Sequence, residues 1–345
     1  TFLDFIDSLR NDKKPFLRYL HILLPHRIWE YLPSGHYYDP FEIEHVAFDE
    51  TVIWENDTTV REAYQRHLLQ VQYVDRLVGK LIHKLDSEKL FDESMIILVG
   101  DHGVGFTQGE KFREVSPLNY PEMMWVPFFI KYPHQEKGQT LDWNVETLDT
   151  LPTVASILKF QVPWKEDGYS LLKGRPARTS KKIGIDFGKK RLVYSGDLAQ
   201  IQRSVNRKIQ MFGEEENANL FKAGPDPWML GKAASSDSFH PSIQVTINKL
   251  ERFQNVDPDS ISLPALLTGT IQSDSLLDNR YDIAISMNGV FCATGYTHPL
   301  RKKGRQTFRV MIPENSFVKG ANDVKVFVRS ADGKYLMLKN AGQQL

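Results

Sequence analysis

Asp101 and His102 stand side by side where an apolar run ends, and together they could bind a metal ion. Residues 95–99, Met-Ile-Ile-Leu-Val, do not alternate with polar residues, which is typical of a strand covered on both faces. A carboxylate oxygen and an imidazole nitrogen suit a divalent cation such as manganese or zinc. Gly103 and Gly105 would let the backbone approach an ion or a phosphate closely. The same residues could instead simply turn the chain, so the pair needs support from elsewhere in the sequence.

His26 is the second residue whose position indicates chemistry. It follows the strand-like run 16–23 and the rigid Pro25. A histidine placed there could meet an anionic substrate or protonate a leaving group, although a surface histidine is the simpler alternative. Ligands of open α/β sheets bind at the carboxyl ends of strands. We therefore expect His26 and the Asp101–His102 pair to share one rim of a sheet.

The elements that would position these residues alternate between strands and helices. A cluster at 57–59, Asp-Thr-Thr, is typical of a helix N-cap. Apolar residues then recur at helical spacing for about seven turns: Tyr64, Leu68, Val71, Val74, Val78, Leu81 and Leu85. A second strand is predicted at 126–130 and a second helix at 149–158, with Pro152 in its permissive first turn. This order predicts an α/β fold with a mostly parallel sheet.

The pattern changes after about residue 180. Runs at 183–187 and 191–194 flank Gly188-Lys189-Lys190 and predict a hairpin, which a polar helical stretch follows. Six short strands separated by turns are then predicted at 243–247, 266–271, 281–287, 291–294, 307–312 and 324–328. They favour a smaller antiparallel β-sandwich. The predicted division is 1–180 for the α/β part, 181–238 for a connecting hairpin and helix, and 239–345 for the sandwich.

Composition narrows the classes of function. Lys and Arg together number 43, and so do Asp and Glu, so the formal net charge is zero. A net charge of zero gives no electrostatic argument for a nucleic-acid partner. The basic runs 173–182 and 301–305 are interpreted as solvated linker or turn. The single cysteine, Cys292, is predicted to be a buried apolar residue. The chain begins at Thr1 inside an amphipathic pattern, which suggests that it is a piece of a longer protein.

The order of these segments resembles the second half of a sulfatase-family catalytic domain, in the alkaline phosphatase superfamily. The resemblance covers about residues 1–172: the run 15–26, the helix containing Tyr64 and Asp75, the stretch 96–103, the run 126–133 and the stretch 147–153. The loop 29–35 and the stretch 101–106 resemble a branch of large, membrane-anchored bacterial proteins with a sulfatase-like extracytoplasmic region. That branch implies the periplasmic face of a bacterial membrane, with the anchor in a missing N-terminal region.

The resemblance also implies roles for individual residues. Asp101 and His102 would ligate a divalent cation (calcium, magnesium, manganese or zinc), and His26 would contact the sulfate or phosphate group. Lys111 would contact substrate oxygens, although many relatives carry a Gly-His pair where 109–111 here read Gly-Glu-Lys. The family's nucleophile and its remaining metal carboxylates lie upstream of the matching region. We therefore expect this chain alone to be inactive.

Three functions remain open at this point. The first is a metal-dependent hydrolase of sulfate or phosphate esters, on a substrate that could be a glycan or a lipid. The second is a phosphotransferase of the phosphoethanolamine or lipoteichoic-acid type, toward which the Asp-His pair leans because true sulfatases commonly carry Asp-Asn. The third is a non-catalytic sulfatase-like scaffold whose β-sandwich binds a glycan or a protein partner.

Overall fold

The fold is known from a computed structural model. It describes residues 1–12, 14–40, 53–174, 181–185, 188, 190–213, 220–234, 238–273, 279–299 and 304–341. The chain forms two compact units. Unit 1 comprises Thr1–Leu20, Asp49–Asp57 and Lys80–Lys208, and unit 2 comprises His21–Phe48, Thr58–Gly79 and Ile209–Leu345. Because the chain passes back and forth between them, each unit is assembled from segments that are distant in sequence.

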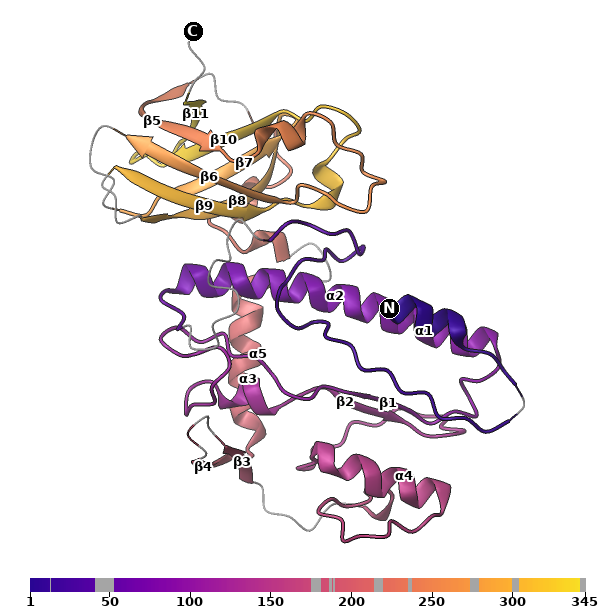
Figure 1. The fold of residues 1–345 in the computed structure, drawn as a ribbon. Coiled ribbons are helices and arrows are strands. Elements are labelled where there is room, and N and C mark those ends of the chain that lie inside the picture. Colours follow the sequence, from indigo (N-terminus) through magenta and orange to yellow (C-terminus); the bar gives the residue numbers. More distant parts are fainter. Residues whose placement is uncertain are drawn as a thin grey trace. The chain divides into compact units, whose positions relative to one another are not determined.

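Unit 1 is a mixture of helices and short strands, as the predicted α/β class requires (Figure 1). Its elements, apart from its share of the long helix α2, are α1 (Phe2–Ser8), β1 (Ile96–Val99), α3 (Tyr120–Met124), β2 (Phe128–Lys131), α4 (Thr150–Leu158), β3 (Lys181–Ile185), β4 (Arg191–Ser195) and most of α5 (Leu198–Phe212). A small core forms where Leu9, Leu85 and Leu90 pack together beside Ile96 of β1. Helix α4 confirms the helix predicted at 149–158.

The described strands of unit 1 do not form the mostly parallel sheet that the sequence predicted. β1 and β2 pair antiparallel, with Ile96 opposite Lys131 and Val99 opposite Phe128. After β1 the chain turns back at the same end of the strand, where the Gly100 N–H donates to the Pro127 carbonyl oxygen at 3.0 Å. A parallel pair would need a crossover to the opposite end. The apolar run carried no information about strand direction. It also predicted a strand covered on both faces, and this was wrong for the described structure, because Leu98 and Val99 are 39% and 42% exposed.

The predicted hairpin near residue 188 is confirmed as a pair of strands. β3 and β4 are antiparallel, with Ile183 opposite Val193. Residues 186–187 of the predicted first strand and Lys189 of the predicted turn lie outside the described residues, as do residues 175–180 and 301–303 of the two basic runs.

The long helix α2 (Asp57–Ser87) starts at the predicted N-cap cluster and contributes residues to both units. Its 31 residues make about eight and a half turns, slightly more than predicted. The buried stripe agrees with the predicted one only in part. Tyr64 and Leu85 are buried as predicted. Leu69 and Leu77 are also buried, whereas the predicted Leu68 and Val78 are only partly buried. Apolar residues occupy neighbouring stripes of this helix, so spacing alone could not show which stripe would be covered.

Unit 2 contains a seven-stranded closed barrel. Its strands are β5 (Phe239–Ile247), β6 (Leu266–Ser273), β7 (Asp282–Met287), β8 (Val290–Pro299), β9 (Arg305–Met311), β10 (Val324–Arg329) and β11 (Tyr335–Asn340). They are ordered β10-β11-β5-β6-β9-β8-β7, and β7 returns to β10. All neighbours are antiparallel except β11 and β5. The six predicted strands are confirmed, and β11 is the additional one.

Closure into a barrel replaces the predicted two-sheet sandwich. The decisive element is β11, which pairs with β10 on one side and with β5 on the other. Its sequence, Tyr-Leu-Met-Leu-Lys-Asn, lacks the alternation that identified the other strands. A barrel has no unpaired edge, so closure satisfies the backbone hydrogen bonds that edge strands would leave exposed.

The barrel core is filled by alternating side chains, of which Ile243, Val245 and Ile247 of β5 are typical. Cys292 lies in this core, and its thiol donates to the Ile285 carbonyl oxygen at 3.6 Å. Burial raises the pKa of Cys292 to about 12, so the thiol stays protonated at neutral pH. The buried apolar role predicted for this cysteine is confirmed.

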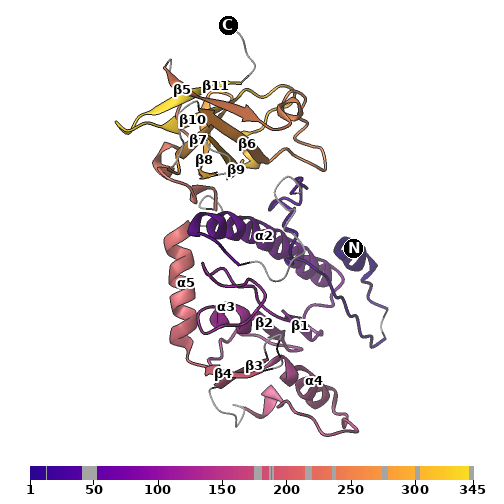
Figure 2. The same ribbon diagram turned by 60° about the vertical axis from the view of Figure 1, so that its left-hand side comes forward.

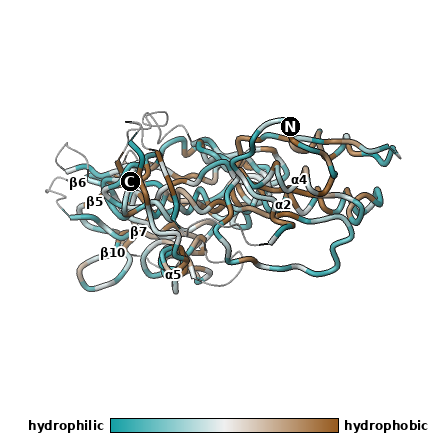
Figure 3. The backbone as a smooth tube through the Cα atoms, turned by 90° about the horizontal axis from the view of Figure 1, so that it is seen from below, coloured by the Kyte–Doolittle hydropathy of each residue, from teal (hydrophilic) through white to brown (hydrophobic). Residues whose placement is uncertain are grey.

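Hydrophobic and hydrophilic stretches alternate along the chain (Figure 3). Among the helices that the structure describes, none combines the length and the hydropathy that a membrane crossing requires.

Candidate metal centre

Asp101 and His102 follow β1 directly and lie on the surface of unit 1. Their side chains are 76% and 39% exposed, and Asp101 Oδ2 lies 3.7 Å from His102 Nε2. Asp101 Oδ1 accepts a hydrogen bond from the His102 backbone N–H at 2.9 Å. A carboxylate oxygen and an imidazole nitrogen at this separation could bind one ion from adjacent positions.

The His102 ring has an anchor that suits a metal ligand. Its Nδ1 lies 2.9 Å from the Gly103 carbonyl oxygen. When Nδ1 carries the ring proton and donates to this carbonyl, Nε2 has the lone pair, and Nε2 is the nitrogen near Asp101. The donor set therefore fits a divalent cation with two ligands from this pair. Within the described ranges, no group of three or more His, Cys, Asp or Glu side chains is close enough to hold an ion.

Gly103 is required by the packing against α3. Its N–H donates to the Met123 carbonyl oxygen at 2.9 Å, and a Cβ at this position would collide with the Glu122 carbonyl oxygen. Gly105 is likewise tight against the Asn119 side chain, because a Cβ there would lie 3.0 Å from Nδ2 of Asn119. The sequence predicted that these glycines would let the backbone approach an ion or a phosphate. In the structure these glycines instead allow close packing of the loop against Glu122 and Asn119 of the protein.

Lys111 lies in the same unit as the Asp101–His102 pair, but its ammonium group forms an ion pair with Glu114. The loop around it is held by the buried Asn119, whose Nδ2 donates to the Lys111 carbonyl oxygen at 3.0 Å and to that of Glu114 at 2.8 Å. To contact substrate oxygens, the Lys111 ammonium group would have to break its ion pair with Glu114 or bind both partners at once. The structure gives Lys111 a local partner and no contact with Asp101 or His102.

His26 belongs to unit 2, whereas Asp101, His102 and Lys111 belong to unit 1. Its side chain is exposed, and Nδ1 contacts the Arg27 carbonyl oxygen. The His26 N–H donates to the Leu23 carbonyl oxygen at 2.6 Å. The shared rim expected for His26 and the metal pair stays a prediction.

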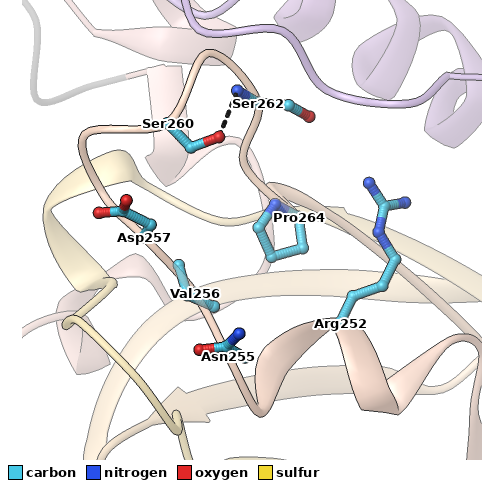
Figure 4. Close-up of a pocket in the computed structure, with 7 residues that line it drawn as sticks. All are labelled: Arg252, Asn255, Val256, Asp257, Ser260, Ser262 and Pro264. Atoms are coloured by element: carbon cyan, nitrogen blue, oxygen red, sulfur yellow. Dashed lines mark hydrogen bonds between the residues drawn. The ribbon is translucent and has the colours of Figure 1, made fainter.

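One hollow lies in the loop beside the barrel and encloses about 220 Å³ (Figure 4). Its lining residues are Arg252, Asn255, Val256, Asp257, Ser260, Ser262 and Pro264. Asp257 is the only acid among them, and Arg252 already lies 3.6 Å from Asp39 Oδ2. The hollow belongs to unit 2 and contains no residue of the metal pair.

Comparison with known proteins identifies the segment that carries the metal pair. The sulfatase family model matches residues 1–160, which include Asp101, His102, Lys111 and His26. Residues 1–160 match the sulfatase family. This finding confirms the resemblance that the order of the motifs indicated.

Individual relatives of the sulfatase segment share modest identity with the chain. An ulvan-active sulfatase of Formosa agariphila is 25% identical over 171 residues, which are 48% of this chain and 33% of the relative. A lipoteichoic acid synthase-like protein of Bacillus subtilis, YvgJ, is 28% identical over 128 residues, 34% of this chain and 20% of the relative. The chain thus spans a third or less of the length of these relatives. A solved 2-O GAG sulfatase structure, 17% identical and covering 44% of each chain, has a TM-score of 0.32.

Gln70 of α2 holds the His26 segment of the sulfatase family region, and sequence reasoning missed it. It is fully buried; its Nε2 donates to the His26 carbonyl oxygen at 2.9 Å, and its Oε1 accepts from the N–H groups of Glu30 at 3.0 Å and Tyr31 at 3.3 Å. An amide is suited to this place because it both donates and accepts. The only signal in the sequence was a glutamine beside the apolar stripe of a long helix.

We expect Gln70→Leu to lower the free energy of unfolding by about 1–3 kcal/mol, because it leaves three partly buried backbone groups without this partner. Urea denaturation of both proteins measures the difference. Gln210→Leu, an exposed change of the same type in α5, should shift it by less than about 0.5 kcal/mol. Equal shifts in the two variants would contradict the role of Gln70.

His67, also in α2, is a partly buried histidine whose ring lies between aromatic neighbours. Its centroid is 5.7 Å from that of Trp29 and 6.2 Å from that of Tyr64. Burial lowers the pKa of His67 to about 4, although a hydrogen bond with the Pro25 backbone opposes the shift. The ring is therefore neutral at pH 7 and serves packing.

Because the pKa of His67 is lower in the folded state, the unfolded chain binds the proton more tightly. Its contribution to stability is complete above about pH 6.5 and is lost as the pH falls towards about 4, by about 1.4 kcal/mol per pH unit. Urea denaturation across this range should show a flatter pH dependence for His67→Gln than for the wild type. The control His21→Gln removes an exposed histidine and should show the wild-type slope, whereas a wild-type slope in His67→Gln would refute the assignment.

Proposed function

We propose that the full-length protein is a metal-dependent sulfatase-family hydrolase of sulfate esters, in which Asp101 and His102 supply two of the metal ligands. The observation that carries the proposal is the Asp101–His102 pair itself, with its oxygen and nitrogen 3.7 Å apart, inside the segment that matches the sulfatase family. The ulvan-active relative supports a sulfated glycan as the substrate class. We also propose an extracytoplasmic location for the site.

The chemistry divides between this chain and the rest of the protein. A bound divalent cation would act as a Lewis acid that neutralises charge developing on the sulfate oxygens. Asp101 and His102 would hold and orient it, with the Gly103 carbonyl fixing the His102 ring. His26 would donate a hydrogen bond to a sulfate oxygen or protonate the leaving alcohol. We place the nucleophile, a formylglycine derived from cysteine or a Ser or Thr hydroxyl, in the protein's upstream part.

A phosphotransferase is the second candidate, and two observations favour it. The pair is Asp-His rather than Asp-Asn, and the lipoteichoic acid synthase-like protein of Bacillus subtilis is among the relatives. Parallel assays of the full-length protein with an aryl sulfate and an aryl phosphate ester distinguish the two. Turnover of the sulfate supports the hydrolase, whereas turnover of only the phosphate supports the alternative.

The metal assignment has a direct test. We expect the full-length protein to retain one equivalent of divalent cation that Asp101→Ala loses, as measured by elemental analysis after dialysis. Asp142→Ala removes an exposed carboxylate elsewhere in unit 1 and should retain the ion. Equal metal content in wild type and Asp101→Ala would rule out the assignment.

A further inference from the structure

The backbone that follows the metal pair is held at Phe106, where both the N–H and the carbonyl oxygen form hydrogen bonds with side chains. The Phe106 N–H donates to Glu122 Oε2 at 2.6 Å, and the Phe106 carbonyl oxygen accepts from Arg207 Nη2 at 2.8 Å. Phe106 itself is buried and stacks on Trp54, with ring centroids 5.9 Å apart. Only three residues separate Phe106 from His102, so these hydrogen bonds restrain the backbone of the metal pair through a very short stretch of chain.

Glu122 and Arg207, the two side chains that hold Phe106, also bind each other. Arg207 Nη2 forms an ion pair with Glu122 Oε1, and the Ser204 hydroxyl donates to the same oxygen at 3.1 Å. The Glu122 side chain is 4% exposed, so its carboxylate depends on these three donors to offset the loss of water. Phe106, Glu122 and Arg207 therefore form a closed ring of charge-assisted hydrogen bonds, which we call the Phe106 clamp.

The clamp joins three separate segments of unit 1. Phe106 belongs to the loop after β1, Glu122 to α3, and Arg207 to α5, which lies beside α3 (Figure 2). Residues 198–212 of α5 lie beyond the segment that matches the sulfatase family, which ends at residue 160. A part of the chain outside the family match thus supports the loop that carries the metal pair.

We propose that Glu122 and Arg207 are positioning residues for the metal site. The inference rests on the proposed function, because it concerns the ion that Asp101 and His102 would hold. The His102 ring is anchored to the Gly103 carbonyl, and the Gly103 N–H is tied to α3 through Met123. When the clamp holds residues 103–107 against α3 and α5, the carboxylate of Asp101 and the imidazole of His102 are presented in one arrangement.

The test is the affinity of the full-length protein for Mn²⁺, measured by calorimetric titration at a temperature at which every variant is folded. Removing an outer-shell partner of a metal ligand typically costs about 10–100-fold in affinity. Arg207 acts through the loop and contacts neither ligand, so we expect Arg207→Gln to weaken Mn²⁺ binding by about tenfold, the lower end of this range. Arg207→Lys, which keeps the charge, should recover part of the loss. The matched control is Arg203→Gln, an exposed change one turn earlier in α5, which should bind as the wild type does.

The outcomes separate the clamp from the metal site itself. If Asp101→Ala loses Mn²⁺ and Arg207→Gln binds it as the wild type does, the clamp is overturned and the proposed function stands. If Asp101→Ala also binds Mn²⁺ normally, both fail. Should Arg207→Gln not fold, Ser204→Ala removes one donor to Glu122 with a smaller disturbance; a weaker affinity supports the clamp, and an unchanged affinity overturns it.

Discussion

Gly103→Ala is expected to abolish metal binding at Asp101 and His102 and to lower the free energy of unfolding by about 1–3 kcal/mol or more. The added Cβ would overlap the Glu122 carbonyl oxygen, which is backbone and cannot rotate away. The chain must therefore separate from α3, and this breaks the hydrogen bond from Gly103 N–H to the Met123 carbonyl oxygen. The same movement displaces the Gly103 carbonyl that anchors the His102 ring.

Urea denaturation and metal analysis of the full-length protein measure the two effects. Gly138→Ala is the matched control because it lies in the same unit and a Cβ there meets nothing within 4 Å. It should leave both quantities near the wild-type values. A Gly103→Ala protein with wild-type stability and metal content would show that the contact with α3 is not needed.

Glu62→Ala is expected to destabilise unit 2 by about 3–5 kcal/mol, because it removes one partner of a largely buried ion-pair network. Glu62 Oε1 lies 2.8 Å from His298 Nε2, and Glu62 Oε2 pairs with Arg309 Nε. Burial raises the pKa of Glu62, but the Arg309 charge and the His298 hydrogen bond outweigh it and leave that pKa below its usual value. The carboxylate is therefore charged at neutral pH and ties α2 to strands β8 and β9.

Urea denaturation at neutral pH tests this prediction. Glu251→Ala removes an exposed carboxylate from unit 2 and should change the free energy of unfolding by less than about 0.5 kcal/mol. Because the folded-state pKa of Glu62 is lowered, its contribution is present above the pKa of the unfolded chain and disappears as the pH falls through the folded value. A loss in Glu62→Ala no larger than that of the control would contradict the network.

Side-chain type and local spacing predicted much of what the structure contains. The metal pair does follow a strand, α2 and α4 begin where their N-terminal signals lie, and Cys292 is buried in the barrel. These features depend on neighbours in the sequence, such as a cap, an apolar run or a helical period, and a single chain carries that information directly. The family resemblance came from the same source, because it rests on the order of short motifs.

Features that depend on partners distant in sequence could not be predicted in this way. The metal pair was visible, but Gln70 was not, because its role follows from three backbone groups about 40 residues away. Arg207 lies about 100 residues from Phe106, and nothing in the residue pattern of α5 indicates which loop Arg207 would bind. Lys111 was placed by resemblance, and its partner Glu114 became evident only from the structure.

The sequence by itself determined the residue types of the candidate metal pair, the helix α2 and the strand β1 that precede it, and the resemblance of residues 1–160 to the sulfatase family. The strand expected at 16–23 was wrong, because these described residues form no regular strand. Only the tertiary structure decided that β1 and β2 run antiparallel, that β11 closes the second unit into a barrel, and that Glu122 and Arg207 hold the loop behind the metal pair. The physical reason is the same in each case. Strand direction, barrel closure and buried ion pairs depend on which distant segments pack together. Local residue patterns do not determine this, because one pattern is compatible with several tertiary arrangements.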